Sequence, residues 1–169
     1  MAILASGTRA PEFTLTDAEG ESRSLEAARA DGQALVAFFS LECRACDLSY
    51  LFWDRMTEAY RDAGCPVLAI SLDGDAAARD FWDRSGVSFA VLSDPAHEVT
   101  RGYGIECTPA LFLVDGEGAI VASHDAFDRA ALNDLSSRIA LRVGRPAVTL
   151  ADDEAPAFSP GCVVHMSGE

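Results

Sequence analysis

The feature that most constrains the fold is a pair of cysteines placed between an apolar run and an amphipathic segment. Residues 34–39 read Ala-Leu-Val-Ala-Phe-Phe, a short continuous apolar run typical of a strand buried on both faces of a sheet. Cys43 and Cys46 follow, separated by two residues. Residues 47–63 then carry apolar side chains mostly three and four positions apart, and Gly64 ends the pattern, which predicts a helix. The spacing of the two cysteines places both sulfur atoms on the first helical turn, close enough for a disulfide of normal geometry.

The rest of the chain alternates predicted strands and helices. Strands are expected at 66–72 and 89–92, followed by a strand–turn–strand hairpin over 110–122. Helices are expected at 75–85, with Asp73 or Asp75 as the cap, at 95–103, opened by Pro95, and at 128–143. This order predicts an α/β fold in which a central mixed β-sheet is covered by helices on both faces.

The length and the composition of the last segment predict one domain with an appendage. A chain of 169 residues suits a single core, which we assign to residues 1–143. Residues 144–169 contain three prolines and an acidic run at 152–154, a composition that favours an extended C-terminal tail. Val163 and Val164 serve no purpose in a solvated tail, so we expect the tail to dock on its own domain or on a neighbouring subunit.

The charge balance excludes two classes of partner. The formal net charge is −14, which repels nucleic-acid backbones and anionic membranes. No apolar run approaches the length of a membrane-spanning helix, so no membrane insertion is expected. The N-terminal sequence has no basic region before its short apolar stretch and does not read as a secretory signal. We therefore expect a cytoplasmic location, or a periplasmic one if a leader precedes this sequence.

The two cysteines of the motif are expected to differ in reactivity. Cys43 sits at or before the first helical position, where unpaired N–H groups and the helix dipole favour a thiolate. Arg44 acts in the same direction, whereas Glu42 and Asp47 oppose it. Cys43 is thus predicted to be the more acidic and the more accessible thiol. Cys46, one turn into the helix, is predicted to be the resolving thiol.

A structural zinc site is the main alternative for such a cysteine pair. Zinc usually takes four ligands, often from a second cysteine pair or from paired histidines. The remaining cysteines and histidines of this chain are scattered along it, at Cys65, Cys107, Cys162, His97, His124 and His165. The spacing therefore favours redox chemistry over a metal site, and no metal is assigned.

Three segments resemble one known family. Phe38-Phe-Ser-Leu-Glu-Cys-Arg-Ala-Cys46 resembles the active-site segment of the redoxin (TlpA-like) branch of the thioredoxin superfamily. The runs Phe89-Ala-Val-Leu-Ser-Asp-Pro95 and Tyr103-Gly-Ile-Glu-Cys-Thr-Pro-Ala-Leu-Phe-Leu-Val-Asp-Gly-Glu-Gly118 resemble the same family. Ala10-Pro-Glu-Phe-Thr-Leu-Thr-Asp17 is similar to the N-terminal strand that the family shares with the AhpC/TSA peroxiredoxins. The resemblance covers residues 8–142 and leaves out the tail.

The resemblance implies a thioredoxin fold with an N-terminal extension and disulfide exchange at Cys43 and Cys46. It also implies a cis-proline loop beside the active site, at Thr108 and Pro109, whose exposed backbone pairs with an extended substrate. No organic cofactor is required. Reductants and oxidants share this motif, so it is compatible with electron flow in either direction.

The sequence departs from the family pattern near the first cysteine. Glu42 replaces the tryptophan that usually precedes it, and Ala37 stands where many thioredoxins carry a buried acidic residue. The proline and threonine found upstream of a peroxidatic cysteine are replaced by Val36 and Ser40. These replacements count against peroxidase activity.

Two further cysteines are candidates for additional redox thiols. Cys107, two residues before Pro109, could equally be a buried apolar thiol, a third redox thiol, or a metal ligand together with Cys43 and Cys46. Cys162 could form a disulfide with Cys43 or Cys107 if the tail docks near the active site, with His165 aiding thiolate formation. Cys65, at a strand start, has a structural interpretation.

The sequence therefore predicts a thiol–disulfide oxidoreductase that exchanges electrons between Cys43–Cys46 and a protein or small-molecule disulfide. A thiol peroxidase, with Cys43 as the peroxidatic residue, is the second enzymatic hypothesis. A non-catalytic metal-binding or chaperone module using Cys43, Cys46 and Cys107 is the alternative from another class.

Overall fold

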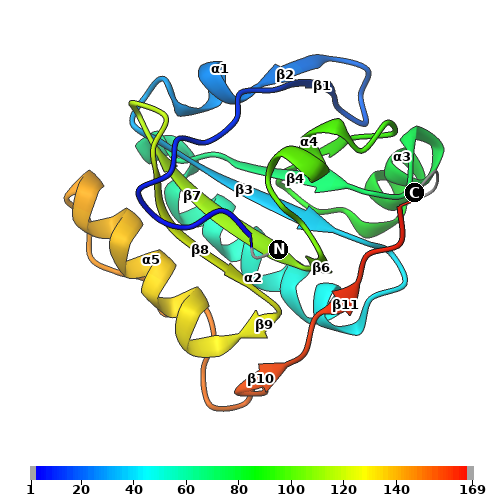
Figure 1. Cartoon of the computed structure of the whole chain (residues 1–169). Helices are drawn as coiled ribbons and strands as arrows, with labels where there is room; N and C mark the ends of the chain where they lie inside the picture. Colours follow the sequence, from blue (N-terminus) through cyan, green and yellow to red (C-terminus); the bar gives the residue numbers. More distant parts are fainter. Residues whose placement is uncertain (1–2, 167–169) are drawn as a thin grey trace.

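A five-stranded mixed sheet forms the centre of the molecule in a computed structural model that describes residues 3–166 (Figure 1). The strand order is β5-β4-β3-β7-β8. The bounds are β3 (Gln33–Phe39), β4 (Val67–Ser71), β5 (Ala90–Ser93), β7 (Ala110–Asp115) and β8 (Ile120–Asp125). Strands β3, β4 and β5 are parallel to one another, whereas β7 is antiparallel to both β3 and β8. The predicted mixed sheet is confirmed.

Strand β3 lies in the middle of this sheet and contributes to both of its faces. All seven of its residues are buried, as expected for the continuous apolar run. Successive side chains of a strand point to opposite faces. Leu35, Ala37 and Phe39 accordingly join one hydrophobic cluster. The alternate residues of the strand join a second cluster on the opposite face.

Helices cover both faces of the sheet, as predicted. The helices are α1 (Leu25–Arg29), α2 (Arg44–Tyr60), the 3₁₀ turn η1 (Arg61–Ala63), α3 (Asp75–Ser85), α4 (Glu98–Gly102) and α5 (Arg129–Val143). Helices α2, α3 and α5 pack on the face of the first cluster. Helix α1, the N-terminal segment and the residues that follow α4 pack on the other face. Figure 1 shows α1 above the sheet and α2 and α5 below it. No helix within residues 3–166 is long and apolar enough to cross a membrane.

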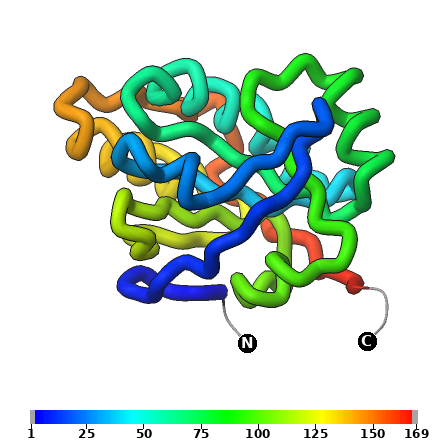
Figure 2. Tube along the Cα trace, turned by 90° about the horizontal axis from the view of Figure 1, so that it is seen from above, coloured from blue at the N-terminus to red at the C-terminus, as the bar shows by residue number. Residues whose placement is uncertain are grey.

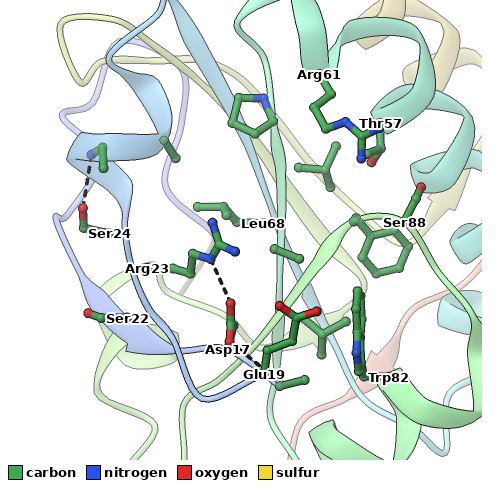
Figure 3. A pocket seen from close by; sticks show the side chains of 18 of the residues that line it. Asp17, Glu19, Ser22, Arg23, Ser24, Thr57, Arg61, Leu68, Trp82 and Ser88 are labelled. Atoms are coloured by element: carbon green, nitrogen blue, oxygen red, sulfur yellow. Dashed lines mark hydrogen bonds and ion pairs between the residues drawn. The ribbon is translucent and has the colours of Figure 1, made fainter.

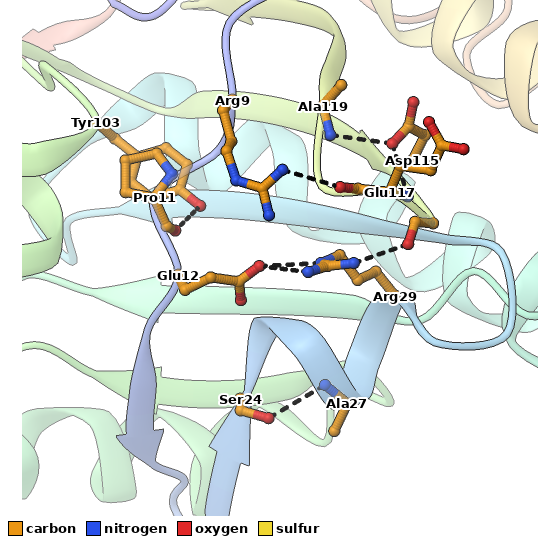
Figure 4. Close-up of polar contacts among 11 residues, drawn as sticks. Arg9, Pro11, Glu12, Ser24, Ala27, Arg29, Tyr103, Asp115, Glu117 and Ala119 are labelled. Atoms are coloured by element: carbon orange, nitrogen blue, oxygen red, sulfur yellow. Dashed lines mark hydrogen bonds and ion pairs between the residues drawn. The ribbon is translucent and has the colours of Figure 1, made fainter.

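The N-terminal extension forms a short hairpin, β1 (Thr14–Thr16) with β2 (Ser22–Ser24), and is fastened to the domain by arginine side chains (Figure 4). Arg29 on α1 contacts Glu12 at 2.6 Å and donates to the Gly116 carbonyl oxygen at 2.7 Å. Arg9 donates to the carbonyl oxygen of Glu117 at 3.3 Å. These contacts tie the extension to the turn between β7 and β8.

Helix α2 begins at Arg44, which confirms the expected place of Cys43 at or before the first helical position, although the apolar pattern by itself begins only at residue 47. The sulfur of Cys43 caps the helix, because it accepts a hydrogen bond from the backbone N–H of Cys46 in the first turn. The apolar periodicity does not reveal such a cap. The helix ends in η1 and then Gly64, whose φ of 83° is left-handed. A Cβ atom at Gly64 would lie 2.5 Å from the carbonyl oxygen of Asp31, so glycine is required there.

The cap of α3 and the start of α4 differ from the prediction. Helix α3 has Gly74 at its N-cap with no side-chain bond, because the Asp73 carboxylate instead accepts a hydrogen bond from the backbone N–H of Leu41 at 2.9 Å. Helix α4 begins at Glu98 rather than at Pro95. The Asp94 carboxylate accepts from the backbone N–H of Thr100 at 2.8 Å, which holds the preceding turn outside the helix.

The tail is extended and packs along the domain, as expected. Leu150 and Ala151 are buried in the cluster beneath α2 and α5. Beyond them, β10 (Phe158–Ser159) pairs with β9 (Phe127–Asp128), and β11 (Cys162–Val163) pairs with β6 (Cys107–Thr108), both antiparallel. Figure 2 shows the red C-terminal segment running beside the green strand that contains β6. Residues 167–169 of the tail lie outside the described residues.

Candidate active site

Cys43 occupies the N-cap of α2, so its side chain faces the unpaired backbone N–H groups of the first helical turn. Its backbone is extended, with φ −133° and ψ 113°, which is the usual conformation of an N-cap residue. The sulfur accepts a hydrogen bond from the backbone N–H of Cys46 at 3.4 Å. The positive end of the helix dipole therefore acts directly on the Cys43 sulfur.

The cis-proline loop lies against the same sulfur. The Thr108–Pro109 peptide bond is cis, which confirms the expected conformation. The Cys43 sulfur lies 3.4 Å from the Thr108 carbonyl oxygen, to which the protonated thiol donates. The Thr108 hydroxyl donates to the Ser40 hydroxyl at 3.1 Å. The fold thus brings Cys43 next to Thr108 and Pro109, which lie more than sixty positions further along the sequence.

The two thiols of the motif have opposite electrostatic surroundings. Burial by itself raises the pKa of Cys43, but hydrogen bonds from Cys162, Cys46 and Thr108 outweigh it and leave this pKa below its ordinary value. Burial also raises the pKa of Cys46, and here the backbone N–H of Ser40 compensates only weakly, so this pKa is far above its ordinary value. Cys43 is therefore the more acidic thiol of the pair. The largest stabilising contributions to the Cys43 thiolate are hydrogen bonds rather than the charge of Arg44.

The expected difference in accessibility is wrong. Cys43 is 1% exposed and Cys46 is fully buried, so neither sulfur is open to solvent in this conformation. The physical reason is the tail, because β11 lies alongside β6 and places Cys162 next to Cys43. The sequence pattern around the motif carries no information about a segment that arrives from more than one hundred positions away.

Cys162 is the third thiol of the site. It lies opposite Thr108 in the β6–β11 ladder, and the Thr108 carbonyl oxygen is 3.4 Å from the Cys43 sulfur, so Cys162 lies beside Cys43 and the first turn of α2, which begins with Arg44 and Ala45. Burial and the neighbouring Cys43 raise the pKa of Cys162, and the backbone N–H groups of Ala45 and Arg44 oppose that rise. Figure 1 shows β11 passing the first turn of α2. His165, which was expected near the thiols, is exposed.

Cys107 and Cys65 do not join this cluster. Cys107 pairs with Val163 across the β6–β11 ladder, whereas Thr108 pairs with Cys162, so Cys107 points to the opposite face of that ladder. Its pKa is raised by burial and nearby negative charge. Within residues 3–166, the side chains close enough together to hold a metal ion are the carboxylates of Asp17, Glu19 and Glu21. Cys107 therefore does not complete a three-thiolate site with Cys43 and Cys46 in this structure. Cys65 is buried, and burial raises its pKa to about 12, which fits the structural interpretation.

Three residues of the site were missed as participants by the sequence interpretation. Ser40 binds the Thr108 hydroxyl through its side chain and Cys46 through its backbone N–H. Its position three residues before Cys43 was the available signal. Tyr50, on α2, has a buried hydroxyl without a partner in the described structure, and burial raises its pKa. Gly161 lets β11 approach β6 closely, and no local pattern in the sequence indicates this role.

A separate hollow of about 690 Å³ lies between the β1–β2 hairpin, α1 and the end of α2 (Figure 3). Inside it, Arg23 contacts the Asp17 carboxylate at 2.8 Å. Burial opposes ionisation of Asp17, but hydrogen bonds from Arg23 and from the backbone N–H groups of Glu21 and Glu19 leave its pKa below the ordinary value. None of the five cysteines, all of which are described, lines this hollow. We assign no role to the hollow.

The sheet order, the cysteine pair at the start of α2 and the cis-proline facing it define a protein of the thioredoxin-fold class. The chain belongs to the AhpC/TSA family, whose model matches residues 6–123. That region contains Cys43, Cys46 and the cis-proline but ends before the tail.

Individual relatives agree with this assignment. The chain is 28% identical over 116 residues to the thiol-disulfide oxidoreductase ResA of Bacillus thuringiensis, and the match covers 68% of this chain and 66% of the relative. The thioredoxin domain of a thiol-disulfide oxidoreductase from Bacteroides vulgatus superposes with a TM-score of 0.71 at 25% identity, covering 80% of this chain and 99% of that one. A hypothetical protein of Sinorhizobium meliloti has a TM-score of 0.77 at 25% identity and covers 100% of this chain and 98% of its own.

Proposed function

We propose that this protein is a thiol–disulfide oxidoreductase that exchanges electrons between Cys43–Cys46 and a disulfide of a protein or small molecule. The observation that carries the proposal is the asymmetry of the two thiols. Hydrogen bonds lower the pKa of Cys43 at the helix start, whereas burial raises that of Cys46 behind it. The likeness to thiol-disulfide oxidoreductases of the ResA type supports the same class of reaction.

Each residue has a distinct task in the proposed exchange. The Cys43 thiolate attacks one sulfur of the substrate disulfide, a bond forms between these two atoms, and the other substrate sulfur leaves as a thiolate. The Cys46 thiol then loses its proton and attacks the Cys43 sulfur, which breaks the mixed disulfide and releases the second substrate thiolate. The substrate disulfide is reduced by two electrons, and Cys43–Cys46 is oxidised by two.

Thr108 and Pro109 form the substrate contact in this proposal. The Thr108 carbonyl oxygen is already 3.4 Å from the reacting sulfur, so a backbone that pairs with β6 brings its own sulfur to Cys43. The protein surface is strongly acidic, with a net charge of −14, which favours partners that are not themselves strongly acidic around their disulfide.

Reduction of insulin disulfides by the dithiol-reduced protein tests the proposal. Cys43→Ser should abolish turnover, because no other thiol has both a lowered pKa and a place at the helix start. Cys65→Ala is the matched control, since this thiol is buried away from the cluster, and it should keep most of the activity. Full activity in Cys43→Ser, or loss of activity in Cys65→Ala without unfolding, would contradict the assignment. Consumption of hydrogen peroxide by the same variants tests the peroxidase hypothesis, and we expect none beyond the Cys43→Ser background.

A further inference from the structure

The tail of this chain occupies the edge that the proposed substrate needs. Strand β11 pairs antiparallel with β6, so that Cys162 lies opposite Thr108 and Val163 opposite Cys107. The backbone N–H of Val164 donates to the Glu106 carbonyl oxygen at 2.9 Å and continues the ladder. An extended peptide that bound Thr108 through its backbone would make contacts of this kind. The tail therefore takes the place of an extended substrate.

The approach of the tail depends on Gly161. A Cβ atom at this position would lie 2.9 Å from the Thr108 carbonyl oxygen and 3.2 Å from the Cys107 Cβ atom. Side-chain carbon atoms do not approach a backbone oxygen so closely, so any other residue would displace the segment. The absence of a side chain at Gly161 brings the following residue, Cys162, into contact with the active site.

Cys162 is the residue that this placement delivers to Cys43. It lies opposite Thr108, whose carbonyl oxygen is 3.4 Å from the Cys43 sulfur, and each of the two thiols shifts the pKa of the other. Both sulfurs thus share the anion-stabilising end of α2. Residue Cys162 is partly exposed, whereas Cys43 and Cys46 are buried.

We propose that Cys162 is a third redox thiol that exchanges with the Cys43–Cys46 disulfide, held in place by residues 160–164 as a built-in strand on β6. This inference rests on the proposed function, because it requires a reactive Cys43. It adds a covalent state, the Cys43–Cys162 disulfide, in which the tail is locked over the substrate edge.

The exchange is balanced without any further reagent. Cys162 loses its proton to solvent and its sulfur attacks the Cys43 sulfur of the oxidised pair. The Cys43–Cys162 bond forms, the Cys43–Cys46 bond breaks, and its electron pair passes to Cys46, which takes up a proton. One disulfide is present before and after the step, so no net oxidation occurs. The disulfide moves from a pair of buried residues to a pair whose second residue, Cys162, is partly exposed, which favours attack by an external thiol there.

Disulfide mapping tests this directly, because trypsin places each cysteine on its own peptide. The peptides are 30–44, 45–55, 62–79, 102–129 and 143–169, since the bond between Arg145 and Pro146 is not cut. Wild-type protein is equilibrated with oxidised glutathione to one disulfide per chain, quenched in acid, alkylated and digested. We expect 30–44 linked to 143–169 alongside 30–44 linked to 45–55. In Cys46→Ser we expect 30–44 linked to 143–169 at a rate independent of protein concentration, because the tethered thiol has a high effective concentration, on the order of mM.

Two variants of the tail separate strand placement from the thiol itself. Gly161→Ala keeps every cysteine but forces β11 away from β6, so the share of the link between 30–44 and 143–169 should fall several-fold. Val163→Ala is the matched control, because the Val163 side chain is 68% exposed and the ladder uses its backbone. It should leave that share unchanged.

The outcomes distinguish this inference from the proposed function. Absence of the link between 30–44 and 143–169 from the wild type or from Cys46→Ser would overturn the inference, as would a link from 30–44 to 102–129 in its place. If the link between 30–44 and 143–169 has the same share in Gly161→Ala as in Val163→Ala, pairing of β11 with β6 does not position Cys162. The double variant Cys46→Ser/Cys162→Ser tests Cys43 alone: uptake of glutathione on 30–44 shows that Cys43 is reactive, whereas no uptake refutes the proposed function as well.

Discussion

Asn133 on α5 is the anchor of the tail, and its removal offers the sharpest test of how the tail is held. The side-chain amide donates to the Ala151 carbonyl oxygen at 2.7 Å. The side-chain oxygen accepts from the backbone N–H groups of Leu150 at 2.9 Å and Ala151 at 3.1 Å. Leu150 and Ala151 are 1% and 2% exposed, so water cannot easily replace these bonds. Asn133→Ala should therefore release the tail from the domain.

The magnitude follows from the three bonds that are lost. Each contributes about 0.5–1.5 kcal/mol net, and a buried backbone group left without a partner costs about 1–3 kcal/mol. Part of this cost disappears once the segment moves into water, so we expect the docking free energy to fall by about 2–4 kcal/mol. The amides of Leu150 and Ala151 exchange through opening of this segment, and their hydrogen exchange should accelerate roughly 30- to 700-fold, with a factor of ten for each 1.4 kcal/mol.

Hydrogen exchange followed by mass spectrometry of a peptide that covers residues 147–155 provides the measurement. Ser137→Ala is the matched control on the same helix, because the exposed Ser137 hydroxyl donates within α5, to the Asn133 carbonyl oxygen at 3.1 Å. It should leave the exchange of that peptide unchanged. Alkylation of Cys43 should also accelerate in Asn133→Ala, since the anchor precedes β11. Unchanged exchange in Asn133→Ala would refute the view that these bonds hold the tail.

Three further predictions concern proton binding and backbone strain. The rate of Cys43 alkylation by iodoacetamide, read on its own tryptic peptide, should have a pH midpoint below that of a free thiol, whereas the midpoint for Cys107 should lie above it, because their pKa values shift in opposite directions. The lowered pKa of Asp17 stabilises the fold at pH values above the ordinary pKa of 3.8, and this contribution is lost as the pH falls through the lower pKa of the folded state. The difference in free energy of unfolding in urea between the wild type and Asp17→Asn should therefore be largest near pH 6 and vanish at strongly acid pH. Gly64→Ala should destabilise by more than about 2 kcal/mol, because it combines a positive φ with a backbone clash, whereas Gly20→Ala, at a similar φ in open space, should lose only about 1–2 kcal/mol in the same assay.

Local sequence patterns were sufficient for the five strands of the central sheet and for α2, α3, α4 and α5, but they did not reveal α1 or the β1–β2 hairpin. The apolar run before the cysteines predicted β3, because a strand buried on both faces must be apolar at every position. The helix from 75 to 85 was predicted with its observed bounds. The predicted start of α4 was wrong because a side chain outside the helix, that of Asp94, accepts a hydrogen bond from the backbone N–H of Thr100. Capping by a cysteine sulfur, which starts α2 at Arg44, also has no strong sequence signal.

The composition of the active site was readable in part. The cysteine pair was identified from its spacing at a predicted helix start, whereas the cis-proline was expected from the family resemblance. The low exposure of Cys43 was not predicted, because the exposure of a side chain depends on every segment that packs against it. The roles of Cys43, Cys46, Thr108 and Pro109 in catalysis stay predictions that the experiments above address.

The sequence by itself determined the class of fold, the position of the reactive pair and the presence of a tail with an apolar end. These properties depend on periodicity, spacing and composition, which act over a few residues. Only the tertiary structure decided where the tail lies and which of the remaining cysteines meets Cys43. Cys107 is nearer to the motif in sequence, but alternation along β6 points it to the other face of the ladder, whereas Cys162 arrives opposite Thr108. The register of one short strand pair, β6 with β11, therefore selects the third thiol of the site.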